Sequence, residues 1–461
     1  MKKTAAILAA KLVRSASRVK KTAATAAPGY LAERIDPNLL KKLGSINFPD
    51  GVILVTGTNG KTTTTKVLAD VLQNDQISFV NNRAGSNLSR GVISSILTEA
   101  NLKGFTRARV GLFEVDEAYL PEVTAALQPK MVVVTNLFRD QLDRYGELDS
   151  IANKFRQAFK NLRSTTLVLN ADDPLVASLG MKLSGSVKVL YFGVSDTSAF
   201  TALEHDRTAD SIVDPFSGES LVYKYRYFGH IGTYSTKSGV FGRPKPQIDV
   251  TKIVKTTSKS IKIKVKTTTE LHSVSVNLSG NYNIYNVLPA FAMAQLFRIE
   301  SSVLTQSLAN LSAAFGRTEA MKIGKTQFGL YLIKNPTGFN QVIQSFIQKD
   351  TACPLLIAIN DNIADGRDVS WLWDCAVEDF ARRRGPVIVT GTRALDMQLR
   401  LAYAGYTGKM ILETDTKNAL EKAHKLAKGR RVIVLPTYTA MLTLRTLINQ
   451  VNNQGSKEFW Q

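Results

Sequence analysis

The sequence predicts an α/β protein built from two mainly parallel sheets flanked by helices. Short apolar runs rich in β-branched residues alternate with helical segments in both halves of the chain, which is typical of doubly wound sheets. A glycine-rich turn joins the first of these runs, 51–56, to a helix. Aromatic residues crowd 223–234, which predicts a hairpin whose rings pack across its strands.

The composition is that of a globular protein with buried cores. Hydrophobic residues make up 44% of the 461 residues and charged residues 21%, which excludes a disordered or collagen-like chain. The two cysteines, Cys353 and Cys375, exclude a disulfide scaffold and fit a reducing compartment. No uncharged apolar run reaches about 18 residues, so the sequence predicts no membrane-spanning helix. The net charge of +21 predicts an anionic partner or surface.

Much of the basic charge lies at the amino terminus. Residues 1–48 hold ten lysines and arginines against two acids, which gives a net charge of +8. Lys11 interrupts the first apolar stretch and thereby excludes a secretory signal. The apolar residues expected on one face of a helix here are Ile7, Leu8, Leu12 and Val19. Two interpretations stay open: a helix packed on its own domain with a solvated basic side, which is favoured, and a helix on an anionic membrane surface.

The turn after the first apolar run has the composition of a phosphate-binding loop. Glycines permit the tight turn, and backbone amides at the start of the following helix attract phosphate oxygens. In such loops the lysine, here Lys61, contacts the outer phosphates, and the next hydroxyl, here of Thr62, ligates Mg²⁺. The Lys-Thr pair disfavours an ordinary glycine turn. The candidate nucleotide-binding residues are Gly57, Thr58, Asn59, Gly60, Lys61 and Thr62.

This loop resembles that of the Mur ligase family, which includes folylpolyglutamate synthase and joins amino groups to carboxylates through acyl phosphates. Three later residues match family positions. Glu114, at the end of a strand-like run, matches a magnesium ligand. Asn283, in a Gly-x-x-Asn-x-x-Asn segment, matches a residue that faces adenine, and Arg317 matches an arginine against the outer phosphates. The resemblance therefore implies ATP and Mg²⁺.

Two positions depart from the family pattern. Gln141 stands where members place a histidine that helps to hold a second magnesium ion. Lys154 lies near the place of a carbamylated lysine, but its spacing does not match, so no such role is assigned to it.

Within the family, the chain resembles the MurT branch most. The segments that carry this resemblance are 81–87, 114–117, 138–146, 170–174, 334–340 and 360–371. MurT-like chains act with a class I glutaminase subunit, GatD, whose Cys–His pair takes its acidic third member from the MurT chain. A carboxylate in that role orients the imidazole and stabilises its charged form. By its position in Asp-Gly-Arg-Asp, Asp368 corresponds to this catalytic acid. Asp368 as a helix N-cap is the alternative, and Asp361 and Asp365 are competing acids.

The family's small ribbon usually binds zinc through four cysteines, and this chain lacks them. The residues at the corresponding positions are Asp214, Ser217, Thr236 and Gly239. Structural zinc is held by thiolates and imidazoles, so the sequence predicts no zinc here.

We expect three parts along the chain. Residues 1–48 form the basic amino-terminal segment. Residues 49–315 form the Mur ligase-like ATP-binding domain, with a degenerate zinc ribbon inserted at about 203–248. Residues 316–461 form a Rossmann-like carboxy-terminal α/β domain.

The resemblance implies ATP-dependent amidation of the D-glutamate α-carboxylate of lipid II, with ammonia from a GatD-like partner. It also implies a cytoplasmic protein, with membrane-surface contact at the inner face of the cell membrane left open. The alternatives are an amino-acid ligase of the Mur or folylpolyglutamate type that acts alone and a non-catalytic nucleotide-binding subunit. A nucleic-acid-binding protein is disfavoured because the basic residues are dispersed and no helix-turn-helix motif is present.

Overall fold

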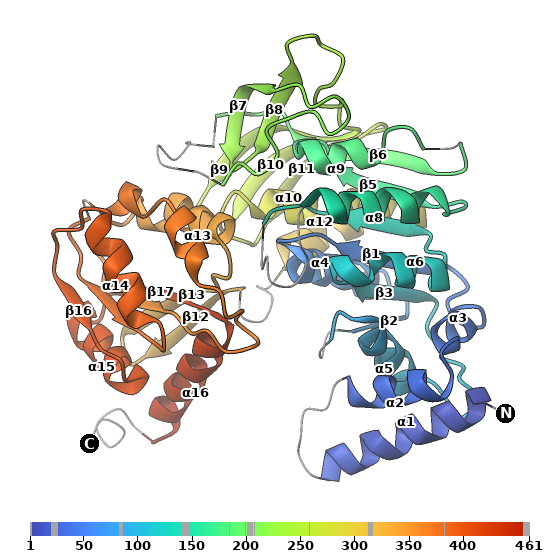
Figure 1. Ribbon diagram of the computed structural model, residues 1–461, viewed down its shortest axis with the longest axis horizontal. Coiled ribbons are helices and arrows are strands. Elements are labelled where there is room, and N and C mark those ends of the chain that lie inside the picture. The colour runs from blue at the N-terminus through green and yellow to red at the C-terminus, as the bar shows by residue number, and fades with distance from the viewer. Residues whose placement is uncertain are drawn as a thin grey trace.

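A computed structural model shows two α/β bodies and a projecting hairpin (Figure 1). The structure describes residues 2–19, 26–82, 86–139, 148–183, 185–198, 200, 206, 208–257, 259–311, 317–381 and 383–454. Both bodies consist of a mainly parallel sheet with helices on its two faces, so the predicted α/β fold class is confirmed.

The first body is built on a nine-stranded sheet in the order β11-β10-β9-β6-β5-β4-β1-β3-β2. Strands β1 to β6 and β9 run parallel, and β10 and β11 are antiparallel to their neighbours. The strand bounds are β1 (Gly51–Thr56), β2 (Phe79–Asn81), β3 (Val110–Glu114), β4 (Met131–Val134), β5 (Thr166–Asn170), β6 (Lys188–Val194), β9 (Ile248–Thr256), β10 (Ile261–Lys266) and β11 (Leu271–Val276). Because β1 lies between β3 and β4, the segments that follow these three strands meet at one edge of the sheet.

Helices cover both faces of this sheet. One face carries α1 (Lys2–Val19), α2 (Ala27–Ile35), α3 (Leu39–Gly44), α5 (Ser89–Glu99), η1 (Glu117–Tyr119), α6 (Leu120–Leu127), α8 (Leu148–Lys160) and α9 (Pro174–Leu179). The other face carries α4 (Lys61–Asn74), α10 (Asn283–Val287), α11 (Pro289–Phe297) and α12 (Ser301–Ala309). The basic amino-terminal segment therefore shares a hydrophobic core with the sheet.

The first helix packs on its own domain, as the favoured interpretation expected. Its buried side combines Ile7 with two alanines and not with Leu8 and Leu12. Ile7 is fully buried together with Ala6 and Ala10. Leu8 and Leu12 are 45% and 71% exposed, so the prediction that they share a face with Ile7 is wrong. The side chain of Val19 lies outside the described residues. In the part of the chain that the structure describes, no helix combines the length and apolarity needed to cross a membrane.

The insert forms a separate two-stranded hairpin of β7 (Leu221–Phe228) and β8 (Ile231–Thr236). Tyr223 is paired with Tyr234 across the hairpin, and their ring centroids lie 5.9 Å apart. Tyr227 and Phe228 are buried in the core of the large sheet. Tyr225 is exposed and takes no part in this packing, contrary to the expectation that all the rings pack.

The second body is a six-stranded sheet in the order β12-β13-β17-β14-β15-β16, in which only β12 is antiparallel to its neighbour. Its strands are β12 (Arg317–Ile323), β13 (Thr326–Tyr331), β14 (Leu355–Ala358), β15 (Val387–Thr390), β16 (Met410–Leu412) and β17 (Arg431–Pro436). Its helical elements are α13 (Pro336–Val342), η2 (Ile343–Ile347), η3 (Ser370–Asp374), η4 (Val377–Phe380), α14 (Ala394–Tyr403), α15 (Thr416–Ala427) and α16 (Tyr438–Gln454). The predicted domain boundary at residues 315 and 316 lies outside the described residues.

The packing of α1 predicts a contrast between two substitutions of similar size. Ile7→Ala leaves a cavity in the core and should lower the apparent free energy of unfolding by about 2 kcal/mol or more. Leu12→Ala removes an exposed side chain and should change this free energy by less than about 0.5 kcal/mol. Urea unfolding followed by circular dichroism measures both. Equal effects of the two substitutions would contradict the assignment of the buried face.

Candidate active site

The turn after β1 requires glycine at two positions. Gly57 has φ of 119° and Gly60 has φ of 90°, a region that L-residues with side chains rarely adopt. A Cβ atom on Gly60 would lie 2.1 Å from Asn286 Oδ1, and one on Gly57 would lie 2.4 Å from Thr135 Oγ1. The turn is therefore packed closely against Thr135 and Asn286, and both positions require glycine.

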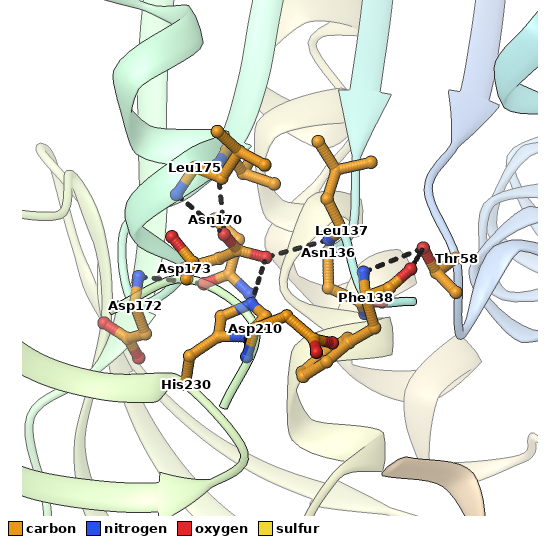
Figure 2. Close-up of polar contacts among 12 residues, drawn as sticks. Thr58, Asn136, Leu137, Phe138, Asn170, Asp172, Asp173, Leu175, Asp210 and His230 are labelled. Carbon is orange, nitrogen blue, oxygen red and sulfur yellow. Dashed lines mark hydrogen bonds and ion pairs between the residues drawn. The ribbon is translucent and has the colours of Figure 1, made fainter. Parts of the chain in front are cut away.

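The segment after β4 holds this turn in place. Asn59 N donates to Asn136 Oδ1 at 2.9 Å, and Asn136 Nδ2 donates to Asn59 O at 3.0 Å. Thr58 N donates to Asn136 O at 2.8 Å, while the Thr58 hydroxyl donates to Phe138 O at 3.1 Å. Figure 2 shows Thr58 and Phe138 in this contact. The loop conformation thus depends on the neighbouring strand as well as on its own glycines.

Lys61 opens α4 and is buried together with a carboxylate. Its Nζ donates to Gly57 O at 2.6 Å and to Glu117 Oε2 at 3.0 Å, and both side chains are almost inaccessible to solvent. A buried ammonium group needs such partners, because an unpaired buried charge is strongly destabilising. Glu117 lies in segment 114–117, which carries part of the family resemblance. No local sequence pattern indicates that it pairs with Lys61.

The two predicted magnesium ligands lie on neighbouring elements. Thr62 is in the first turn of α4, and Glu114 is the last residue of β3, paired in register with Val55 of β1. Asn82 fixes the Glu114 backbone: Glu114 N donates to Asn82 Oδ1 at 2.9 Å, and Asn82 Nδ2 donates to Glu114 O at 2.7 Å. Hydroxyl and carboxylate oxygens are the hard donors that Mg²⁺ prefers, so this pair fits the ion chemically.

Residues of both bodies line one cavity in front of the loop. From the first body these include Asn59, Gly60, Thr63, Tyr282 and Asn283, and from the second Tyr331, Lys334, Gly338 and Gln341. Asn283 accepts a hydrogen bond from Asn286 Nδ2 at 2.8 Å and donates to Ser279 O at 2.7 Å. Asn59 Nδ2 is buried and has no hydrogen-bond partner among the described residues. The cavity thus combines rings, amides and a helix N-terminus, which suits a nucleotide.

Direct hydrogen bonds join the two bodies beside this cavity. Asn335 Nδ2 donates to Asn59 Oδ1 at 3.1 Å, across 276 positions of sequence. Asn340 Nδ2 donates to Asp206 Oδ1 at 3.0 Å. The second body therefore contacts the loop itself.

A buried histidine links the hairpin to the segment that holds the loop (Figure 2). His230 Nδ1 accepts a hydrogen bond from Asp210 N at 3.2 Å, and its ring stacks on Phe138 with centroids 4.2 Å apart. His230 Nε2 lies 3.4 Å from Asp173 Oδ2, outside hydrogen-bond geometry. The same Asp173 oxygen accepts from Leu137 N at 2.9 Å. The hairpin is thereby connected to the residues after β4.

The neighbouring Asp172 is fully buried. Burial raises its pKa, and this is opposed by the Arg243 guanidinium and by hydrogen bonds from Tyr285 and Val194. Tyr285 OH donates to Asp172 Oδ2 at 2.8 Å. These contacts tie the end of β5 to α10 and to the segment after the hairpin.

The structure locates Arg317, Gln141 and Lys154 to different extents. Arg317 begins β12, in register with Tyr331 of the cavity, but its side chain lies outside the described residues, as does Gln141 entirely. Lys154 lines a different cavity between α6 and α8, which agrees with giving it no catalytic role.

The acids near Asp368 divide between structural and exposed positions. Asp365 is buried and accepts hydrogen bonds from the amide and hydroxyl of Thr439 at 2.7 and 2.5 Å, at the start of α16. Asp361 accepts from Thr392 and Arg393, which lower its pKa. Asp368 is exposed and accepts a hydrogen bond from Ser370 N at 2.8 Å, but the N-cap of η3 is Val369, so Asp368 is not the helix cap. Of these three acids, Asp368 is the one with an exposed carboxylate.

Hydrogen-bonded turns occupy the positions where the family ribbon has cysteines. Asp214 is buried, accepts from Phe216 N at 2.9 Å and also accepts from the Ser217 hydroxyl. Thr236 Oγ1 accepts from Phe241 N at 3.1 Å. Both cysteines of the chain lie in the second body, so these turns contain no thiolate.

Family models match two segments of the chain. The model described as "Mur ligase middle domain" matches residues 55–235, and the one described as "MurT ligase C-terminal" matches residues 332–441. The chain is 30% identical to the lipid II isoglutaminyl synthase (glutamine-hydrolyzing) subunit MurT of Staphylococcus aureus (strain COL), over 98% of each chain. It is 31% identical to the subunit of the same name from Streptococcus pneumoniae (strain ATCC BAA-255 / R6), over 91% of each chain.

Solved structures share the fold at low sequence identity. A pseudomurein peptide ligase type C from Methanothermus fervidus superimposes with a TM-score of 0.69 at 18% identity, covering 89% of this chain and 80% of that one. Folylpolyglutamate synthase of Mycobacterium tuberculosis, complexed with ADP and AMPPCP, has a TM-score of 0.64 at 12% identity and coverages of 89% and 94%.

The hydrogen-bonded turns of the insert predict that its stability does not depend on a metal ion. They predict that its stability does depend on the Asp214 carboxylate. Dialysis against EDTA should leave the melting temperature unchanged, and elemental analysis should find no stoichiometric zinc. Asp214→Ala should lower stability by about 1–3 kcal/mol, because the buried carboxylate accepts hydrogen bonds from Phe216 N and the Ser217 hydroxyl. Val240→Ala, at an exposed position just after β8, is the control. Stoichiometric zinc in the purified protein would contradict this account.

Proposed function

The chain belongs to the MurT family of Mur ligases, and from that premise we propose that it amidates the D-glutamate α-carboxylate of lipid II to D-isoglutamine. The reaction would consume ATP and use ammonia released by a GatD-like glutaminase. The observation that carries the proposal is the loop 57–62, which faces a cavity lined by both bodies. The named function of the relatives supports it.

ATP would bind with its phosphates on this loop. Gly60 lines the cavity, and the start of α4 attracts anionic oxygens. Lys61 would neutralise charge on the outer phosphates. Asn283 would face the base, in the part of the cavity that it lines with Tyr282. Arg317 would reach the outer phosphates from the second body.

Thr62 and Glu114 would hold Mg²⁺, which supplies charge neutralisation during phosphoryl transfer. The proposed chemistry has two steps. A carboxylate oxygen of the substrate attacks the γ-phosphorus and ADP leaves, which gives an acyl phosphate. Ammonia then attacks the acyl carbon, the C–O bond to phosphate breaks, and the nitrogen loses a proton. Exclusion of water from the cavity would favour this sequence, because water hydrolyses an acyl phosphate.

Asp368 would complete the partner's catalytic triad. Its carboxylate is exposed, as an acid that acts on another chain must be, while Asp361 and Asp365 are held by neighbours of their own. Exposed apolar side chains accompany it: Trp373 and Tyr403 lie with ring centroids 5.4 Å apart, and Leu399 is exposed one turn before Tyr403. Large aromatic side chains at a protein surface are typical of protein interfaces. We therefore place the glutaminase on this surface.

The lipid-linked substrate would bring the protein to the inner face of the cell membrane from the cytoplasm. A ligase that acts alone is the alternative. It is disfavoured by Gln141, which replaces the histidine that such ligases carry, and by the match of residues 332–441 to the MurT model.

Lys61→Ala tests the ATP site. Loss of the ammonium group should lower amidation of lipid II by about 100-fold or more, because it removes stabilisation of the phosphoryl-transfer transition state. Lys66→Ala, on the same helix and paired with Asp70, is the matched control and should retain activity. Amidation is measured by mass spectrometry with ATP, glutamine and the partner present. Unchanged amidation by Lys61→Ala refutes the assignment.

Asp368→Asn separates the two half-reactions. Glutamine hydrolysis by the complex should fall by about 1,000-fold, as when the acid of a triad is replaced. Amidation with ammonium chloride should continue, because the ATP site is intact. Asp361→Asn is the control in the same loop. If the control loses glutaminase activity and Asp368→Asn retains it, Asp361 is the acid.

A further inference from the structure

We propose that the outward face of α1 is a membrane-contact surface that lies on bilayers containing anionic phospholipids. This surface, the α1 face, consists of Ala5, Leu8, Leu12 and Ala16, and the exposed Leu102 and Phe105 lie on the neighbouring loop between α5 and β3. The inference deepens the proposed function and rests on it only for the presence of a lipid-linked substrate.

The two sides of α1 are both apolar. Its inner side, with Ala6, Ile7 and Ala10, is buried against the first body. The outer residues 5, 8, 12 and 16 recur at helical spacing and form a second stripe that the described residues leave exposed. A surface helix usually places polar residues outward, so this stripe is unusual for a face in contact with water alone.

The loop after α5 packs beside the first two turns of α1, on the side of Lys3 and Ile7. Lys3 Nζ lies 5.6 Å from the centroid of the Phe105 ring. A Cβ atom on Gly104 would lie 3.1 Å from Ile7 Cδ1, which shows that the loop backbone packs directly on the helix. Leu102 and Phe105 are 59% and 48% exposed at this place.

The charge around the α1 face is positive. The helix contains five lysines and arginines and no acid. Lys11 and Arg14 fasten it to the end of α5: Lys11 Nζ donates to Ala100 O at 2.6 Å, and Arg14 Nη1 donates to Thr98 O at 2.8 Å. Lys2, Lys103 and Arg107 are exposed around the stripe, and Glu99 is the exposed acid nearby. Anionic headgroups complement this distribution.

A bilayer accounts for both properties of the α1 face. Leucines enter the region between headgroups and acyl chains, while lysines stay at the phosphates. A nucleic acid would use the charge but not the exposed leucines. A second copy packed on the same face would bring the two basic rims together, which is unfavourable. Figure 1 shows α1 at the outer edge of the first body, with α2 and α5 on its inner side.

Vesicle sedimentation tests the proposal with the full chain. The protein should sediment with vesicles of equal parts phosphatidylglycerol and phosphatidylcholine, and much less with phosphatidylcholine alone. The double variant Leu8→Gln/Leu12→Gln should bind about tenfold less, because it removes apolar side chains but keeps good helix formers and all charges. The control, Val254→Gln/Leu271→Gln, changes two exposed apolar residues at the other end of the sheet and should bind like the wild type.

Equal binding of the wild type and Leu8→Gln/Leu12→Gln overturns the proposal, and so does an absence of binding to anionic vesicles. Analytical ultracentrifugation of both proteins tests self-association, and a dimer that the double variant converts to monomer also overturns it. The proposed function is tested separately with lipid II in detergent. Leu8→Gln/Leu12→Gln should amidate this substrate at the wild-type rate, whereas Lys61→Ala should bind vesicles but not amidate.

Discussion

The candidate site depends on the hydrogen bonds between Asn136 and the turn after β1. The backbone carbonyl and both polar side-chain atoms of Asn136 bond to residues 58 and 59, so the turn has one conformation relative to β4. Asn59 then accepts from Asn335 of the second body. Position and shape of the cavity therefore follow from the order of strands β4, β1 and β3.

The buried Lys61–Glu117 pair adds an electrostatic constraint to this geometry. The Glu117 carboxylate pairs with the Lys61 ammonium group at a place where both side chains are almost inaccessible to solvent. Phosphate oxygens bound on the loop would compete with Glu117 for the same ammonium group. The lysine is thus held in place without a ligand, and a polyanion that took over its interaction would leave the buried Glu117 carboxylate without this cation, which carries an electrostatic cost.

Local sequence patterns predicted the strands, the glycine turn and the α/β class, because each depends on neighbouring residues. Contacts between distant residues gave no such pattern, as with Asn59 and Asn335 or Lys61 and Glu117. The phase of α1 was misjudged because alanines 6 and 10 form its buried side, and small side chains carry little weight in a hydrophobic pattern. Residues 140–147, which include Gln141, lie outside the described residues, so the structure does not test the prediction made for them.

The excess positive charge serves several structural purposes, so it cannot by itself identify a partner. In the second body, Arg383 Nη2 donates to Cys353 O at 2.6 Å, and Arg400 Nη2 donates to Cys375 O and Glu378 at 2.8 Å. Both arginines are buried, and burial lowers the pKa of Arg383. Such groups present no charge to a polyanion. A partner can respond only to the exposed remainder, and on α1 that remainder surrounds exposed leucines, a combination that matches a lipid surface better than a nucleic acid.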